Sequence, residues 1–130
     1  FAQAPERSRV SGMRATRFGD LTFLDHVDLS VDKIYYIVLV SVDASSNLLW
    51  AGIQKNKEHE ETIRVAKTCY EQWHAHPKAI WAYAYFHADK FFKWYQYQNI
   101  KPIARGQNTP WPNRAEAAVK AFKKHTQRLI

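Results

Sequence analysis

The chain is organised around the stretch Gly106-Gln107-Asn108-Thr109-Pro110-Trp111-Pro112-Asn113-Arg114-Ala115-Glu116. Its glycine and two prolines predict a loop, because both residue types interrupt regular helices and strands. Asn113 is a favourable N-cap residue, so a helix is predicted to begin there. The sequence therefore predicts a proline-rich loop that leads directly into a C-terminal helix.

The predicted helix has two different faces. Apolar residues recur at helical spacing and predict its buried side, namely Ala115, Ala118, Val119, Phe122 and Leu129. A second side begins with a carboxylate and continues with amines and an amide, namely Glu116, Lys120, Lys123 and Gln127. Such a side can hold a metal ion at its start and a phosphate backbone along its length. Asn113 and Glu116 also have the spacing of a capping box, and lysines on a helix are commonly just solvated, so both interpretations stay open.

Length and composition predict a single folded domain. The 130 residues are 46% hydrophobic and 15% aromatic, which favours a real core over disorder. No apolar run is long enough to span a bilayer, and the first residues do not resemble a signal peptide. Cys69 is the single cysteine, which excludes a disulfide framework and fits a reducing compartment and a buried structural thiol.

The positive charge is concentrated at the C-terminal end of the chain. Residues 101–130 hold seven Lys or Arg against one acid, Glu116, and so contribute +6 of the net +7. This distribution favours a polyanionic partner such as DNA, with a simply solvated helix as the alternative. Residues 1–18 are polar and rich in arginine, and they predict an arm or linker ahead of a domain at 19–130.

The apolar periodicity predicts an α/β fold with a five-stranded mixed sheet flanked by helices. Three strands joined by tight turns predict an antiparallel meander, at Leu21–Leu29, Ile34–Val42 and Leu48–Ile53. Helices and strands then alternate: a helix over about 57–75 capped by Asn56, a strand at Ala79–Phe86, a short aromatic helix or turn at Phe91–Gln98 and a short strand at Ile100–Ala104. The alternation predicts crossover connections after the meander.

Acidic residues lie on or next to several of these predicted strands and helices. Asp25 shares the apolar face of the first strand, which is a costly position for a carboxylate without a partner. Asp28 faces the other way, and Asp43 is assigned to a turn. Asp89 follows a strand and Glu116 lies in the first turn of the last helix. If Asp25, Asp89 and Glu116 converge, they would repel one another unless a divalent metal neutralised them, and Mg²⁺ with such ligands suits phosphoryl transfer.

Several motifs in this order resemble one protein family. They are Phe18-Gly19-Asp20-Leu21-Thr22-Phe23-Leu24-Asp25, Val42-Asp43, His87-Ala88-Asp89, Asn99-Ile100-Lys101-Pro102 and Thr109-Pro110-Trp111-Pro112-Asn113-Arg114-Ala115-Glu116, the last two being the strongest match. The chain resembles the catalytic core of retroviral and long-terminal-repeat retrotransposon integrases, which are Asp-Asp-Glu polynucleotidyl transferases. The resemblance covers roughly residues 18–130 and implies a ribonuclease-H-like fold.

The resemblance also implies functional residues. Asp25, Asp89 and Glu116 would be the catalytic acids and would bind Mg²⁺ or Mn²⁺, with two ions per site. Asp28 is the alternative to Asp25, and the strand-face argument favours Asp25. Six residues would contact DNA: Lys120, Lys123, Lys124, Arg114, Asn108 and Thr109. The implied reaction trims the 3′ end of retroelement DNA and then joins that end to target DNA, without a covalent protein intermediate. A homodimer or higher homo-oligomer is implied because two DNA ends are joined together, and a nuclear location, preceded by a virus-like particle or the cytoplasm, is expected.

One feature departs from the family pattern. Asp89 and Glu116 are separated by 26 residues, fewer than is usual, and the shortening is expected near residues 90–98. Two further functions therefore stay open. One is a metal nuclease that cuts without joining, and the other is a catalytically silent, domesticated DNA-binding or assembly domain of the same fold.

Overall fold

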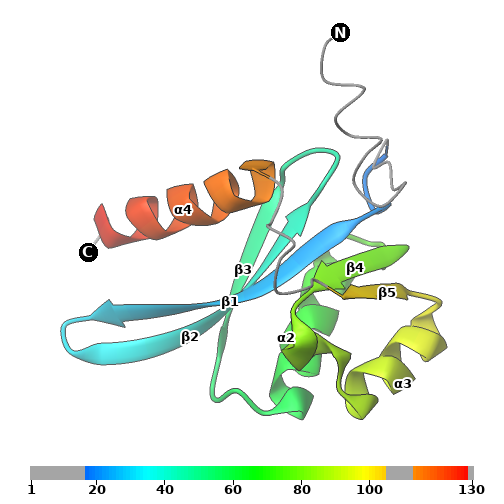
Figure 1. Cartoon of the computed structure of the whole chain (residues 1–130). Helices are drawn as coiled ribbons and strands as arrows, with labels where there is room; N and C mark the ends of the chain where they lie inside the picture. Colours follow the sequence, from blue (N-terminus) through cyan, green and yellow to red (C-terminus); the bar gives the residue numbers. More distant parts are fainter. Residues whose placement is uncertain (1–16, 105–112, 129–130) are drawn as a thin grey trace, which may run out of the picture.

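The computed structural model describes residues 17–104 and 113–128, with side chains from 117 to 126 in the second range. Within these residues, five strands form one sheet in the order β3-β2-β1-β4-β5 (Figure 1). The meander is antiparallel and consists of β1 (Thr22–Val31), β2 (Ile34–Asp43) and β3 (Leu49–Gln54). Two parallel strands follow, β4 (Ala79–Ala82) beside β1 and β5 (Lys101–Ala104) beside β4. The predicted mixed sheet is confirmed.

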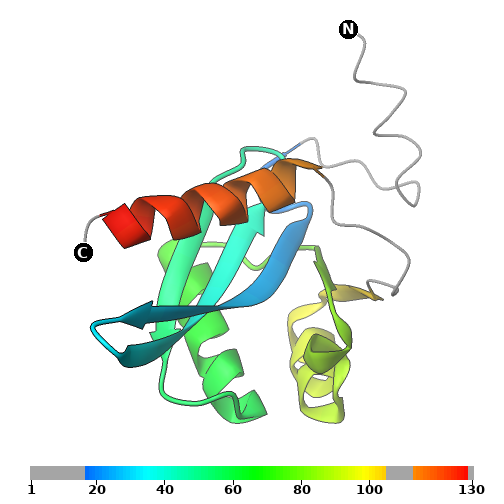
Figure 2. The same cartoon turned by 60° about the vertical axis from the view of Figure 1, so that its left-hand side comes forward.

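Helices cover both faces of the sheet. On one face lie α2 (His59–Gln72) and α3 (Asp89–Gln98), and on the other lies α4 (Asn113–Arg128) (Figures 1 and 2). A short 3₁₀ helix, η1 (Ala84–His87), connects β4 to α3. None of the helices in the described part of the chain is long and apolar enough to cross a membrane.

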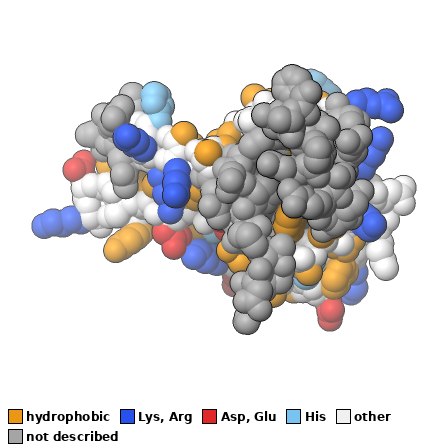
Figure 3. Space-filling model, turned by 45° about the horizontal axis from the view of Figure 1, so that its top comes forward, with side chains coloured by type: hydrophobic (Ala, Val, Ile, Leu, Met, Phe, Trp, Pro, Cys, Tyr) orange, Lys and Arg blue, Asp and Glu red, His pale blue; other side chains and the backbone are white. Residues whose placement is uncertain are grey.

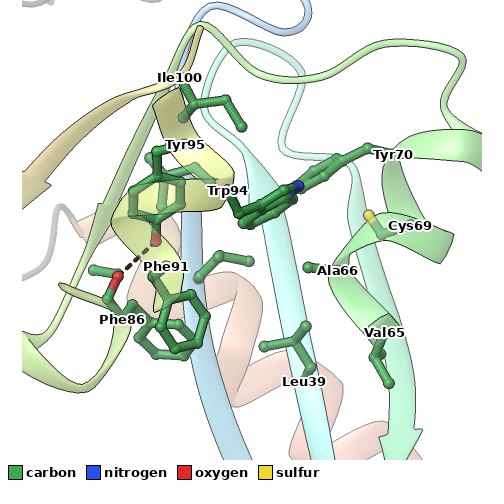
Figure 4. Packing of buried hydrophobic residues seen from close by; sticks show 13 residues of the cluster. Leu39, Val65, Ala66, Cys69, Tyr70, Phe86, Phe91, Trp94, Tyr95 and Ile100 are labelled. Carbon is green, nitrogen blue, oxygen red and sulfur yellow. Dashed lines mark hydrogen bonds between the residues drawn. The ribbon is translucent and has the colours of Figure 1, made fainter. Parts of the chain in front are cut away.

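Aromatic packing fills the space between the sheet and the layer of α2 and α3. Tyr70 of α2 stacks on Trp94 of α3 with ring centroids 6.2 Å apart (Figure 4). Phe86 and Phe91 lie below this pair, and the hydroxyl of Tyr95 donates a hydrogen bond to the Phe86 carbonyl at 2.7 Å. These rings fix η1 and α3 against the sheet, because each large ring removes much apolar area from water.

A second apolar cluster holds α4 on the opposite face. The sheet contributes buried valines of β1 and β2, together with Phe23 and Trp81, whose ring centroids lie 5.5 Å apart. The helix contributes the half-buried Ala118, Val119 and Phe122. These three belong to the buried helix face that the sequence predicts, so that part of the prediction is confirmed.

Two structural predictions about polar and thiol groups are also confirmed. The fully buried Asp43 serves the turn after β2, because its carboxylate accepts hydrogen bonds from the backbone N of Gly19 and Ser46 and from the hydroxyls of Ser45 and Ser46. Cys69 of α2 is buried in the cluster between the sheet and the layer of α2 and α3, and burial raises the pKa of its thiol to about 12, which suits a structural role.

Two element boundaries differ from the predictions. The strand predicted at Ala79–Phe86 ends at Ala82, and η1 follows, because the rings of Tyr85 and Phe86 pack into the aromatic cluster instead of continuing the strand. The helix predicted over about 57–75 spans His59–Gln72, with Glu58 at its N-cap. Asn56 instead accepts a hydrogen bond from the Glu58 backbone N at 2.9 Å, in the turn before the helix.

Candidate functional site

The order in which strands are added to the sheet reverses at β1, and a site is expected at this point. From β1 the chain first adds β2 and β3 on one side and later adds β4 and β5 on the other. In open α/β sheets, ligands bind beside the carboxyl ends of strands at such a switch point. Because β4 is short, its carboxyl end at Ala82 lies against the first half of β1.

Asp25 lies at this place, on the face that α4 covers. It alternates with Phe23 and Val27, which are both buried in the cluster under α4, and it pairs with Val40 across β2. Its side chain is half-buried, and its Oδ1 accepts a hydrogen bond from the His26 backbone N at 2.8 Å. The predicted face of Asp25 is therefore confirmed.

Asp28, the alternative to Asp25, lies on the opposite face of β1. It is exposed and forms an ion pair with Lys57, with Oδ2 and Nζ 3.3 Å apart. This position separates Asp28 from α4, and it agrees with the strand-face argument that favours Asp25.

Helix α4 brings its basic residues to the same side of the sheet as Asp25. Lys120, Lys123 and Lys124 are exposed, while other residues of the helix contact the sheet. Figure 3 shows basic side chains standing out from this part of the molecule. Glu116 is the fourth residue of α4, but its side chain and that of Arg114 lie outside the described residues. Asn108 and Thr109 also lie outside them.

The structure places Asp89 elsewhere. It is the first residue of α3 and is exposed, and η1 separates it from the end of β4. The next residue, Lys90, forms an ion pair with Glu60 of α2, so this helix start belongs to the layer opposite α4. The prediction that places Asp89 at the end of a strand is therefore wrong, because β4 ends at Ala82 and the six residues 83–88 separate it from Asp89.

The residue that does follow β4 is Tyr83. In the parallel register, Thr22 pairs with Ile80 and Phe23 with Trp81, so continuing the register places residue 83 beside Asp25. Tyr83 keeps an extended backbone, with φ −69° and ψ 170°, and is 41% exposed. Sequence reasoning gave this residue no place in the metal site, because the apolar run continues from Ala79 to Phe86 and does not show where the strand ends.

A polar network on the other face of β1 was also missed. The Nε2 of His26 lies 3.1 Å from Gln54 Oε1 and 3.3 Å from Thr62 Oγ1. Thr62 Oγ1 lies 2.9 Å from the Tyr85 hydroxyl, which donates to the Lys57 carbonyl at 2.6 Å. Each of these groups has a partner within the network, which fits a structural role in joining β1, β3, α2 and η1.

The described residues fit a divalent metal ion in part. Asp25 is a suitable oxygen ligand, whereas Asp89 lies in another layer and a phenol such as Tyr83 is not among the ligands that Mg²⁺ prefers. Among the side chains that the structure describes, no group of three or more His, Cys, Asp or Glu could hold a metal ion.

Solved structures share this architecture, although no protein-family model and no curated protein matches the chain. The HTLV-2 integrase catalytic core domain, in complex with magnesium in its trimeric form, superposes with a TM-score of 0.76 at 17% identity, covering 89% of this chain and 74% of that chain. The simian T-cell lymphotropic virus intasome, in complex with the PP2A regulatory subunit B56 gamma, gives 0.72 at 15% identity, covering 86% and 40%. The BIV integrase catalytic core domain gives 0.62 at 15%, covering 82% and 65%. The chain therefore has the ribonuclease-H-like fold of integrase catalytic cores, as the resemblance implied.

Proposed function

We propose that this chain is a DNA-binding domain of the integrase catalytic-core type, which holds retroelement DNA ends and target DNA along α4. The observation that carries the proposal is the division of α4 into two sides. Val119 and Phe122 anchor the helix to the sheet, whereas Lys120, Lys123 and Lys124 face solvent on the side of the sheet that bears Asp25.

The anchoring of α4 matters because it fixes the positions of the lysine ammonium groups. A helix held by an apolar face presents its ammonium groups at fixed spacing, and fixed cations can contact successive phosphates along a strand. The excess of +6 in residues 101–130 adds a general attraction for polyanions. The binding predicted here is therefore strong at low salt and weakens steeply as salt is added.

Fluorescence anisotropy with a labelled duplex tests the proposal. Replacing Lys120 and Lys123 together by alanine should weaken binding and flatten the dependence of log K on log salt by about 0.9 for each phosphate that the variant no longer neutralises. The matched control replaces Lys67 and Lys93, two exposed lysines of α2 and α3 on the opposite face. Equal reductions in affinity in the two double variants would show that net charge, and not α4, determines binding.

The second candidate function is metal-dependent phosphodiester cleavage followed by strand transfer. The half-buried Asp25 on the α4 face, with Glu116 in the first turn of α4, favours it. Mg²⁺ or Mn²⁺ would supply the charge for in-line displacement, and Asp25 with Glu116 would hold the ions. A labelled DNA end separates the candidates: joined products indicate a transferase, shortened ends alone a nuclease, and bound but unchanged DNA a silent DNA-binding or assembly domain.

Self-association is part of the proposal. Two of the similar structures are described as dimeric and trimeric forms of the HTLV-2 integrase core, and a third is an intasome. These assemblies support a homo-oligomer here, since one domain offers one α4 and two DNA ends have to be held together. The nuclear location stays a prediction from the resemblance.

A further inference from the structure

We infer that Tyr83 occupies the place of the second carboxylate in the proposed integrase-type site, so that this chain does not assemble a complete divalent-metal site and an aspartate at position 83 would rebuild one. The inference rests on the function proposed above. It deepens that proposal by naming Tyr83 as the residue that would make this domain catalytically silent. Four observations carry it.

The register of the sheet gives the position. The ladder between β1 and β4 pairs Thr22 with Ile80 and Phe23 with Trp81. Two residues further along each strand are Asp25 and Tyr83. Residue 83 is also the first residue beyond the carboxyl end of β4, at the point where ligand sites are built in open α/β sheets.

The alternation of the strands gives the face. Phe23 and Trp81 both lie in the cluster under α4, with ring centroids 5.5 Å apart. Side chains two residues apart on an extended strand share a face, and the backbone of Tyr83 is still extended. Positions 25 and 83 therefore lie on the face that α4 covers, next to one another.

Asp89 is not free to take this place. Two hydrogen bonds hold the last residues of η1, just before it: His87 Nε2 lies 2.9 Å from the Ala82 carbonyl oxygen, and the Tyr95 hydroxyl donates to the Phe86 carbonyl at 2.7 Å. Phe86 is also 1% exposed. Bringing Asp89 to the end of β4 would require this buried segment to unfold.

The spacing along the chain agrees. Helix α3 is present from Asp89 to Gln98, so the short interval between Asp89 and Glu116 retains this helix. Counting the interval from position 83 lengthens it by six residues. The expected shortening near residues 90–98 is therefore not found, and the interval is short because it was counted from the wrong residue.

The side chain at position 83 determines whether this place can bind a divalent cation. A neutral phenol supplies neither the negative charge nor the carboxylate oxygens that Mg²⁺ and Mn²⁺ require. With aspartate at position 83, two carboxylates would lie side by side at the end of β4, where their repulsion favours a bound divalent cation.

Calorimetric titration with Mn²⁺ and with Mg²⁺ tests the inference on the full chain. Wild type should bind either ion at least about tenfold more weakly than Tyr83→Asp, since losing even a supporting partner of a metal ligand costs about that much. Tyr83→Asn is the matched control without charge, and Asp25→Asn combined with Tyr83→Asp should abolish the gain.

Two further variants keep the inference testable if Tyr83→Asp folds poorly. Asp89→Asn should leave metal binding unchanged in wild type, and Tyr83→Glu offers a second carboxylate of different length. Saturable binding by wild type that Asp89→Asn removes, or a folded Tyr83→Asp that binds no better than Tyr83→Asn, would overturn the inference. DNA binding by wild type is measured separately, so a failure of the proposed function is distinguishable from a failure of the metal result.

Discussion

His26 illustrates how one side chain couples the central strand to the helices above it. Its ring stacks on Phe86 with centroids 5.1 Å apart, and its Nε2 contacts Gln54 and Thr62. Burial lowers the pKa of His26 below its usual value, and the hydrogen bond with Gln54 opposes this shift without cancelling it. The folded protein therefore favours the neutral imidazole.

Stability should depend on pH through His26. Because its pKa is lower in the folded protein than in the unfolded chain, the unfolded chain binds the proton first as pH falls. The stabilisation is complete above the unfolded pKa of about 6.5 and is lost as pH falls through the folded pKa, by at most about 1.4 kcal/mol per pH unit. Urea unfolding of wild type and His26→Gln between pH 7.5 and 5 measures the slope.

The control for this experiment is His125→Gln, because His125 is exposed on α4. We expect the pH slope of this variant to match that of wild type, while His26→Gln has a smaller slope. Identical slopes in all three proteins would show that the pH dependence arises from other groups.

Sequence reasoning succeeded for single residues where the local pattern determined the answer. Alternation along the first strand was enough to assign the face of Asp25, and turn chemistry was enough to assign Asp43. It failed at Asp89 and Tyr83 because alanines and aromatics fit a strand and a buried 3₁₀ turn equally well. Packing of Phe86 against α3 decides between the two, and that contact is between separate elements, which the local pattern does not show.

Among the elements, α2 and β3 approach each other closely at Gly52. A Cβ added there would lie 2.4 Å from Cη2 of Trp50 and 2.9 Å from Cγ1 of Val65. The Trp50 indole is itself held in place, because it donates a hydrogen bond to Gln72 Oε1 at 2.7 Å. Glycine is needed at this position because no side chain fits between the strand and the helix.

Gly52→Ala should therefore destabilise the protein by about 1–3 kcal/mol, the usual cost of overpacking. Urea unfolding measures the change. A double-mutant cycle with Trp50→Leu provides the control, since removing the closest ring atoms should make the combined destabilisation smaller than the sum of the two single effects. A Gly52→Ala variant as stable as wild type would mean that α2 and β3 are farther apart in solution.

The elements themselves were largely predictable. Alternation in the first strand, and apolar runs bounded by turn residues in the other two, located the meander to within one or two residues. Helix α3 and strand β5 also appear where the pattern places them. The ends of α2 were less predictable because Asn56 can cap a helix or form a turn with equal ease. In the structure Asn56 lies in the turn, and Glu58 is the N-cap of the helix.

At the scale of the whole molecule, one sheet carries two buried clusters. Leu24 and Leu39 of the two central strands face α2 and α3, while Val27 and Val40 of the same strands face α4. Each cluster holds a tryptophan that is nearly inaccessible to solvent, Trp94 in the first and Trp81 in the second. The two layers therefore depend on the same pair of strands.

Shared strands predict a single cooperative transition. We expect two variants, each retaining either Trp81 or Trp94 and replacing the other four tryptophans with phenylalanine, to show the same urea dependence whether unfolding is followed by fluorescence or by circular dichroism. Adding Phe122→Ala removes apolar packing from α4 alone, yet it should move the midpoints of both variants together. If the Trp81 signal shifted to lower urea while the Trp94 signal did not move, α4 and its cluster would form a separate unit of local unfolding, and the surface that presents Lys120 and Lys123 could loosen while the sheet stays folded.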